Sequence, residues 1–224
     1  MYVIIAGGGE VTRFLSRQFI EAGHEVLVIE PDEKLRERIE SEFDDITLRG
    51  YGYRIESLEA AGISRADVFL AATDTDENNL AACQLAQWQF KVPRVVAKVN
   101  NARNRNIFRK LGIKYTVDVA ALEIENLKVQ IPAFPLARLL SLENDSLEVV
   151  HVRITDDSGL GDKVLSETPL SFLADCSCLV RSGSSPRCVD DSTRLVVGDR
   201  LICLVAQEMV ERLQSGLGGV ELQD

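Results

Sequence analysis

The stretch that decides the fold is Met1–Glu30, which reads MYVIIAGGGEVTRFLSRQFIEAGHEVLVIE. Residues 2–6 form a short apolar run, rich in β-branched side chains, that is typical of a buried strand. Three glycines follow, and residues 10–22 then place apolar side chains at helical spacing. A turn at Gly23 leads into a second apolar run that ends at Glu30. This order predicts a βαβ unit whose glycine-rich turn brings a helix N-terminus to a pyrophosphate site.

An acidic residue completes this pattern. Glu30 lies 21 positions after Gly9, close to the spacing of about 20 that places a carboxylate on a ribose hydroxyl. The phosphate turn itself is unusual, because Thr12 stands at the third glycine position and Glu10 brings a negative charge beside the expected phosphates. The pattern predicts a dinucleotide-binding domain with an altered phosphate turn. We therefore expect weak nucleotide binding that divalent cations assist and that Glu10→Gln tightens.

The βα alternation continues to residue 118. Helical patterns separate further apolar runs, which lie at residues 46–48, 68–72, 95–99 and 115–117. Because each run is continuously hydrophobic, the strands are expected to be covered on both faces, as in a parallel sheet. The predicted fold class is α/β, with a Rossmann-like doubly wound parallel sheet of six strands followed by a smaller α+β domain.

Charge is spread unevenly over the 224 residues, whose formal net charge is −10. Residues 1–118 carry 16 Lys/Arg against 18 Asp/Glu, a net charge of −2, and residues 119–224 carry 9 against 17, a net charge of −8. This break supports two domains, and the acidic balance argues against nucleic acid as a partner. No apolar run reaches the length of a membrane span, and Met1 leads directly into the first strand without room for a signal peptide. We expect a cytoplasmic protein.

Residues 1–118 resemble the N-terminal (TrkA-N) domain of the RCK, or KTN, family of potassium-transport regulators. The motifs that carry the resemblance are the glycine turn 7–11, Glu30, the pair Gly50-x-Gly52, the run 72–80 and the strand 93–99. In that family, these loops line one nucleotide pocket. The resemblance implies that NAD(H) or an adenine nucleotide (ATP or ADP) binds at Gly7, Gly8, Gly9, Glu10, Val11, Thr12, Glu30, Tyr51, Gly52, Thr73, Asp74 and Lys98. Tyr51 and Tyr53 depart from the family, which usually has Asp and Thr there.

Residues 119–142 are expected to form a helical connector. They carry an apolar stripe that is then interrupted by Pro132 and Pro135, which break or kink a helix. In the RCK family a crossover helix at this place contributes to dimer packing, so the resemblance implies a dimer or a dimer-based ring. An ordinary interdomain linker is the alternative.

The remaining residues resemble the RCK C-terminal (TrkA-C) domain, over residues 143–215, with a tail at 216–224. Strands are predicted at residues 147–154, 176–181, 194–197 and 201–205, and a helix at 207–213. The turn Gly198-Asp199-Arg200 is similar to one in the last hairpin of that domain.

The chain offers few candidates for catalysis, and we predict neither catalytic residues nor a metal site. His24 and His151 fit structural roles, and the five cysteines fit free thiols. Asp74 and Asp76 are expected first to cap a helix, and second to contact a nucleotide or cation.

Two functions then compete. The first is a nucleotide-sensing regulatory subunit that gates an integral-membrane potassium transporter or channel and lies at the inner face of the membrane through that partner. The second is an NAD-dependent oxidoreductase, which would need an acid/base group beside the nicotinamide.

Overall fold

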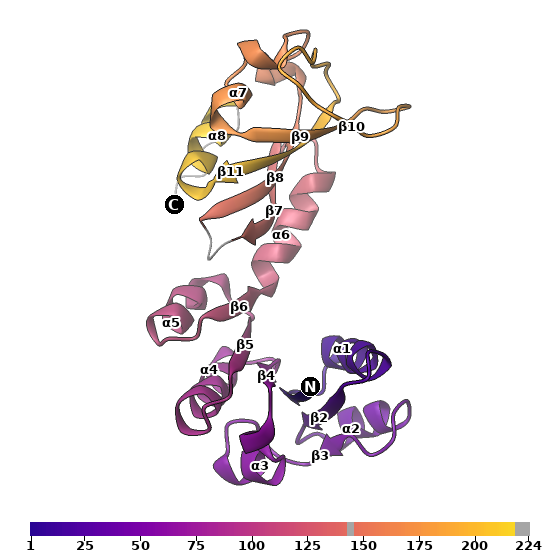
Figure 1. Ribbon diagram of the computed structural model, residues 1–224, viewed down its shortest axis with the longest axis vertical. Coiled ribbons are helices and arrows are strands. Elements are labelled where there is room, and N and C mark those ends of the chain that lie inside the picture. Colours follow the sequence, from indigo (N-terminus) through magenta and orange to yellow (C-terminus); the bar gives the residue numbers. More distant parts are fainter. Residues whose placement is uncertain (143–145, 218–224) are drawn as a thin grey trace. The chain divides into compact units, whose positions relative to one another are not determined.

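The computed structural model describes residues 1–142 and 146–217 (Figure 1). The chain divides into two compact units, Met1–Ala121 and Leu122–Asp224, each with its own sheet and core. Residues 218–224 of the predicted tail lie outside the described residues. Among the described residues, no helix combines the length and the apolar character needed to cross a bilayer.

The first unit is built on a six-stranded sheet in the order β3-β2-β1-β4-β5-β6, with every pair parallel. The strands are β1 (Tyr2–Ala6), β2 (Glu25–Ile29), β3 (Thr47–Leu48), β4 (Val68–Ala71), β5 (Arg94–Val99) and β6 (Tyr115–Asp118). The chain reverses its direction of travel across the sheet between β3 and β4, which places β1 and β4 side by side. The predicted Rossmann-like fold class is confirmed.

Helices cover both faces of this sheet (Figure 1). They are α1 (Glu10–Glu21), α2 (Glu33–Glu40), α3 (Ile55–Ala60), α4 (Asp76–Gln84) and α5 (Arg105–Lys110), with 3-10 turns η1 (Ile63–Arg65) and η3 (Ala102–Asn104) and a π-helical turn η2 (Leu85–Gln89). The alternation of β1 directs Val3 and Ile5 to a core with α1 and α2, and Ile4 to a second core with α3, α4 and α5. The continuous apolar runs are explained by these two cores.

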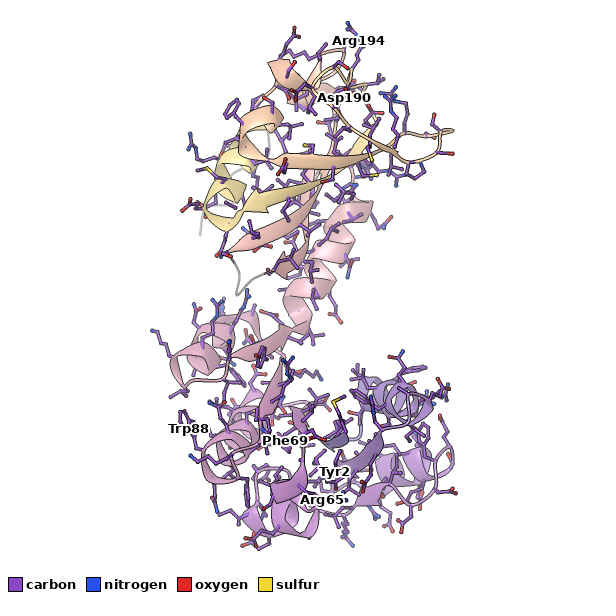
Figure 2. The ribbon with its side chains drawn as sticks, viewed as in Figure 1. Tyr2, Arg65, Phe69, Trp88, Asp190 and Arg194 are labelled. Atoms are coloured by element: carbon purple, nitrogen blue, oxygen red, sulfur yellow. The ribbon has the colours of Figure 1, made fainter. Side chains whose placement is uncertain are left out.

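The amino end of β1 is fixed by Tyr2. Its hydroxyl donates a hydrogen bond to the carbonyl of Ala61 (2.5 Å), and the Arg65 guanidinium lies 3.7 Å from the centre of its ring. Figure 2 shows this pair beside Phe69, a fully buried side chain of the second core. Arg65 also pairs with Glu25 at the start of β2, so one cluster joins β1, β2 and η1.

The second unit holds an antiparallel sheet in the order β10-β9-β11-β8-β7. Its strands are β7 (Leu136–Leu142), β8 (Leu147–Arg153), β9 (Asp175–Val180), β10 (Arg187–Cys188) and β11 (Arg200–Ala206). Its helices are α7 (Leu170–Leu173) and α8 (Val210–Gly216), with 3-10 turns η4 (Asp156–Ser158), η5 (Leu165–Glu167) and η6 (Gln207–Met209). Helix α6 (Val119–Gln130) begins at the end of the first unit and continues into the second. Apolar side chains of α7 and α8 pack with those of β8, β9 and β11 in a single core.

Two features of the second unit differ from the sequence-based expectation. The predicted helical connector 119–142 is helical only to Gln130, because Pro132 and Pro135 end the helix, and residues 136–142 instead pair with β8 as an edge strand. The predicted strand 194–197 makes only an isolated bridge from Arg194 to Val164.

The Gly198-Asp199-Arg200 turn is held by Asp199, which is buried and accepts two hydrogen bonds of 2.7 Å from Arg181.

Candidate functional site

A cavity of about 220 Å³ lies at the carboxyl ends of the parallel strands. Its walls come from the loops that follow β1, β2, β3 and β4, where an open α/β sheet places its ligand. The lining residues are Gly7, Gly8, Gly9, Ile29, Glu30, Pro31, Leu35, Tyr51, Gly52, Tyr53, Ala72, Thr73, Asp74, Thr75, Asn78 and Ala82. A larger and more open groove of about 840 Å³ lies at the amino end of β1 and β2, away from the glycine turn.

The glycine turn is shaped by close approach of two backbones. Gly7 has a φ of +109°, and a side-chain carbon there would lie 2.8 Å from the backbone of Ala72 and Thr73. On the opposite wall, a side-chain carbon at Gly52 would lie 2.3 Å from the Cβ atom of Ala6. Gly9 precedes α1 without any side-chain cap, so the first amide groups of the helix remain available to an anion.

Glu30 occupies the centre of the site. Its side chain is buried, and its Oε2 atom accepts a hydrogen bond from the amide of Gly8 (2.5 Å). Its Oε1 atom accepts another from the amide of Asp32 (2.8 Å). The carboxylate therefore joins the glycine turn to the loop after β2.

Two aromatic rings form the wall contributed by the loop after β3. The rings of Tyr51 and Tyr53 lie 5.3 Å apart between centroids at an angle of 40°, and the Arg54 guanidinium lies 5.4 Å from the Tyr51 ring. Tyr51 remains half exposed at the mouth of the cavity. The rings therefore give this wall a largely apolar surface.

The loop after β4 is held by a network of buried polar side chains. Asn79 donates hydrogen bonds to the carbonyls of Thr73 (3.1 Å) and Lys98 (2.9 Å) and accepts one from the Thr73 amide (2.9 Å). Asp76 accepts hydrogen bonds from the amides of Asn100 (2.6 Å) and Asn101 (3.0 Å). These contacts fix the carboxyl end of β4 to that of β5.

Asp76 does not cap α4, contrary to expectation. It is the first residue of the helix, and its carboxylate crosses to the loop after β5. Burial raises the pKa of the Asp76 carboxyl, but hydrogen bonds from Asn100, Asn104 and Asn101 outweigh this effect and leave the pKa below its usual value. Asp74 lines the cavity with a side chain that is 98% exposed, 3.5 Å from the Lys98 ammonium.

The beginning of α1 differs from the sequence-based picture. Glu10, Val11 and Thr12 are absent from the cavity lining. Glu10 is exposed and pairs with Arg13, which lowers the pKa of the Glu10 carboxyl. Val11 is also exposed, whereas Thr12 is buried against the sheet side of the helix. The charge of Glu10 is therefore partly compensated within α1.

The structure brings most of the predicted site residues to one cavity. Those in its walls are Gly7, Gly8, Gly9, Glu30, Tyr51, Gly52, Thr73 and Asp74, with Lys98 beside Asp74. Sequence reasoning missed Pro31, Leu35 and Asn78 as lining residues, and Asn79 as the centre of the polar network. The local sequence carries no signal for the role of Asn79, because one of its partners is the carbonyl of Lys98, which only the folded sheet brings near.

A family model, the TrkA-N domain, matches residues 3–119 of this chain. A Trk system potassium uptake protein TrkA homolog from Methanothermobacter thermautotrophicus is 34% identical over 169 residues, covering 75% of this chain and 78% of the relative. The Trk system potassium uptake protein TrkA of Mycobacterium tuberculosis is 28% identical over 218 residues, covering 95% and 96%. The chain therefore belongs to the TrkA-N family, and the resemblance inferred from the sequence is confirmed.

Solved structures share the fold over the whole chain. The GsuK channel matches with a TM-score of 0.64 and 17% identity, covering all of this chain, and the same channel bound to NAD matches with a TM-score of 0.66 and 17% identity. This chain spans 40% of the length of those solved chains.

Proposed function

We propose that this protein is a nucleotide-binding regulatory subunit of a potassium transport system and not an enzyme. The observation that carries the proposal is the cavity between the glycine turn and Glu30, at the carboxyl end of the parallel sheet. The names of its relatives, which are Trk potassium uptake proteins, support the same class of function. On this proposal, the second unit is an RCK C-terminal domain that follows the helical connector.

The proposed ligand is NAD(H) or an adenine nucleotide. Structures of the GsuK channel bound to NAD and to ADP support this class of ligand for the fold. The buried carboxylate of Glu30 favours a free ribose 2′-hydroxyl, because a 2′-phosphate would bring a second anion to the same place. Binding of NAD(H), ADP or ATP should therefore be tighter than binding of NADP(H).

The proposed partner is an integral-membrane potassium transporter or channel subunit, and the proposed location is the cytoplasmic face of the membrane. Copies of this chain are expected to associate as a dimer or a dimer-based ring. Nucleotide binding would then change the conformation of several linked copies, as a regulator needs in order to move a gate.

Isothermal calorimetry with NAD⁺, NADH, NADP⁺, ADP and ATP tests the ligand. We expect Glu30→Gln to reduce the preference for NAD⁺ over NADP⁺ by about tenfold, since one repulsive charge is removed. Glu33→Gln, at an exposed position in the first turn of α2, is the matched control and should leave the preference unchanged. Equal or tighter binding of NADP⁺ by the unaltered protein would refute the assignment of Glu30.

A second experiment separates regulation from catalysis. Potassium uptake by cells that lack the gene for this chain should fall, and should recover with the unaltered chain more than with a variant that has lost nucleotide binding. Incubation of the purified protein with NAD⁺ and a panel of alcohols and hydroxy acids tests the oxidoreductase alternative. Steady NADH production by the pure protein would favour that alternative over a regulatory subunit.

A further inference from the structure

Four of the five cysteines lie on three adjacent strands of the second unit. Cys188 is on β10, Cys176 and Cys178 are on β9, and Cys203 is on β11. The strand register places them in two pairs that face each other directly, Cys178 with Cys188 and Cys176 with Cys203. The fifth cysteine, Cys83, is buried in the first unit.

A bulge decides which faces of the sheet the two pairs occupy. The β9–β11 register shifts between Ile202 and Cys203, so that Cys178 faces Ile202 while Cys176 faces Cys203. Cys203 belongs to the core of the second unit, and Cys176 packs against that core. Cys178 and Cys188 lie outside it, so the four thiols cannot gather at one point. In the described part of the chain, no group of three or more His, Cys, Asp or Glu side chains is arranged to hold a metal ion.

We call Cys176 and Cys203 the inner pair, and Cys178 and Cys188 the outer pair. The thiols of the inner pair are in direct contact. The two Sγ atoms of Cys176 and Cys203 lie 2.8 Å apart. Residues that face each other in an antiparallel pair have Cα atoms about 4.5–5.5 Å apart, which is within the range that a disulfide bridges. Closure of a bond between these sulfurs therefore needs a small movement of the side chains and none of the strands.

The two thiols are chemically unequal. Cys176 is half-buried, and its hydrogen-bonded contact with Cys203 lowers the pKa of the Cys176 thiol although burial opposes this. Cys203 is only 1% exposed, and the same contact together with burial raises the pKa of its thiol. Because Cys176 is half-buried and Cys203 is 1% exposed, a small disulfide in solution reaches the Cys176 sulfur first, and Cys203 is the sulfur that follows.

We propose that Cys176 and Cys203 form a redox-active dithiol that a low-molecular-weight disulfide converts to an intramolecular disulfide across β9 and β11. The Cys176 thiolate attacks one sulfur of the small disulfide, RSSR, forming a Cys176–SR bond and releasing RS⁻. Cys203 then loses its proton and attacks the Cys176 sulfur, so that the Cys176–Cys203 bond forms and a second RS⁻ leaves. The protein loses two electrons and two protons, and RSSR becomes two RSH.

Oxidised glutathione, added to the purified full-length chain, is the probe. We expect peptide mapping under non-reducing conditions to find Cys176 joined to Cys203, with the other three of the five cysteines still open to alkylation after unfolding. Because the bond closes a segment between positions 27 apart, the second unit should melt at least about 5 °C higher when oxidised. Excess dithiothreitol should reverse both changes.

Single substitutions distinguish the thiol that attacks the small disulfide, Cys176, from the thiol that then closes the intramolecular bond, Cys203. Cys203→Ser should trap glutathione on Cys176 as a stable mixed disulfide, and Cys176→Ser should leave Cys203 unmodified. The double variant Cys178→Ser, Cys188→Ser is the matched control, because it removes the outer pair, on β9 and β10, and should still form the disulfide between Cys176 and Cys203. Cys83 should not react in any of them, since burial raises the pKa of its thiol to about 12.

Other outcomes overturn the proposal. A disulfide between Cys178 and Cys188, a disulfide between two chains, or a lasting glutathione adduct on the unaltered protein would each show that the inner pair is not a dithiol switch. The map of the unaltered protein decides this even where a variant does not fold. The result is independent of nucleotide binding, so the proposal can fail while the proposed function holds.

Discussion

At the scale of single residues, the candidate site depends on carboxylates whose environments differ greatly. Glu30 and Asp76 are buried and accept hydrogen bonds from backbone amides, whereas Glu10 and Asp74 are exposed. Exposure decides what each carboxylate contributes, because a buried carboxylate holds loops together and an exposed one is screened by water and salt.

The first prediction at this scale concerns Glu10. The pairing with Arg13 compensates part of its charge, so Glu10→Gln should tighten nucleotide binding by only about two- to fivefold, less than an unpaired carboxylate would give. Calorimetry with the tightest nucleotide of the panel measures the effect, with and without Mg²⁺. Glu21→Gln at the other end of α1 is the control. Weaker binding by Glu10→Gln would show that Glu10 helps to hold the ligand.

The second prediction compares Asp76 with Asp74, two positions away. Asp76→Ala leaves the amides of Asn100 and Asn101 without their acceptor and should cost on the order of 2–4 kcal/mol of unfolding free energy. Asp74→Ala should leave stability nearly unchanged, since its side chain is 98% exposed. Urea unfolding of both variants measures the difference. Similar losses in the two variants would be evidence against the proposed network.

Because the pKa of the Asp76 carboxyl is lowered in the folded protein, the free energy of unfolding depends on pH. A carboxyl whose pKa is lower in the folded state stabilises the fold fully above the unfolded value, which is about 3.9. This contribution is lost as pH falls through the folded pKa. Asp76→Asn should therefore flatten the acid side of the stability profile below about pH 4.

At the scale of elements, β8 carries a histidine, His151, whose side chain is buried. It is 5% exposed, and neither ring nitrogen has a hydrogen-bond partner among the described residues. Burial, and then the charges of Arg153 and Arg200, lower the pKa of its imidazole. The folded state thus favours the neutral ring, so stability is complete above the unfolded pKa of about 6.5 and falls as pH drops below it.

His151→Leu should remove this loss between pH 6.5 and pH 5 and should raise stability at neutral pH by about 1 kcal/mol. Thermal unfolding at several pH values measures both effects. His24, the other histidine of the chain, provides the control variant His24→Gln. This variant should lose stability below about pH 6.5, as the unaltered protein does. Retention of that loss in His151→Leu would mean that another group causes it.

The strands of the first unit were predictable, because each is a short, largely apolar run between helical patterns, and the central strands β1, β2 and β4 pack on both faces. Strand β7 could not be predicted. The Leu-rich residues 136–142 carry no local strand pattern and become a strand only by pairing with β8. Glu30 was found from spacing alone. The hydrogen-bond network of Asn79 could not be predicted from the sequence, because it depends on the approach of β4 to β5 in the folded sheet.

At the scale of the whole molecule, α6 and the residues after it leave a large apolar surface uncovered. Its exposed fractions are 44% for Leu122, 51% for Ile124, 62% for Leu127, 43% for Ile131 and 37% for Phe134. Ile124, Leu127 and Ile131 follow one another at helical spacing. A stripe of this kind is typical of a surface between protein chains.

We therefore expect Leu127→Asp to convert the protein to monomers at micromolar concentration, as measured by light scattering after gel filtration. A charge placed in an apolar contact between chains has no partner and disfavours association strongly. Asn126→Asp adds the same charge to the adjacent, exposed position and should preserve the assembly. A monomeric mass for the unaltered protein would exclude the proposed dimer.

The two sheets share one further property, which lies in how they end. On one side, each sheet terminates in a strand of only two residues, β3 and β10. On the other side, the first sheet ends in the four-residue β6, and the second ends in β7, whose seven residues carry a bulge between Arg138 and Leu140. Short edges and bulges offer a poor template to the backbone of a passing chain. We expect the folded protein to resist amyloid-like aggregation when it is crowded or concentrated, even though its strands are among the most hydrophobic segments of the chain.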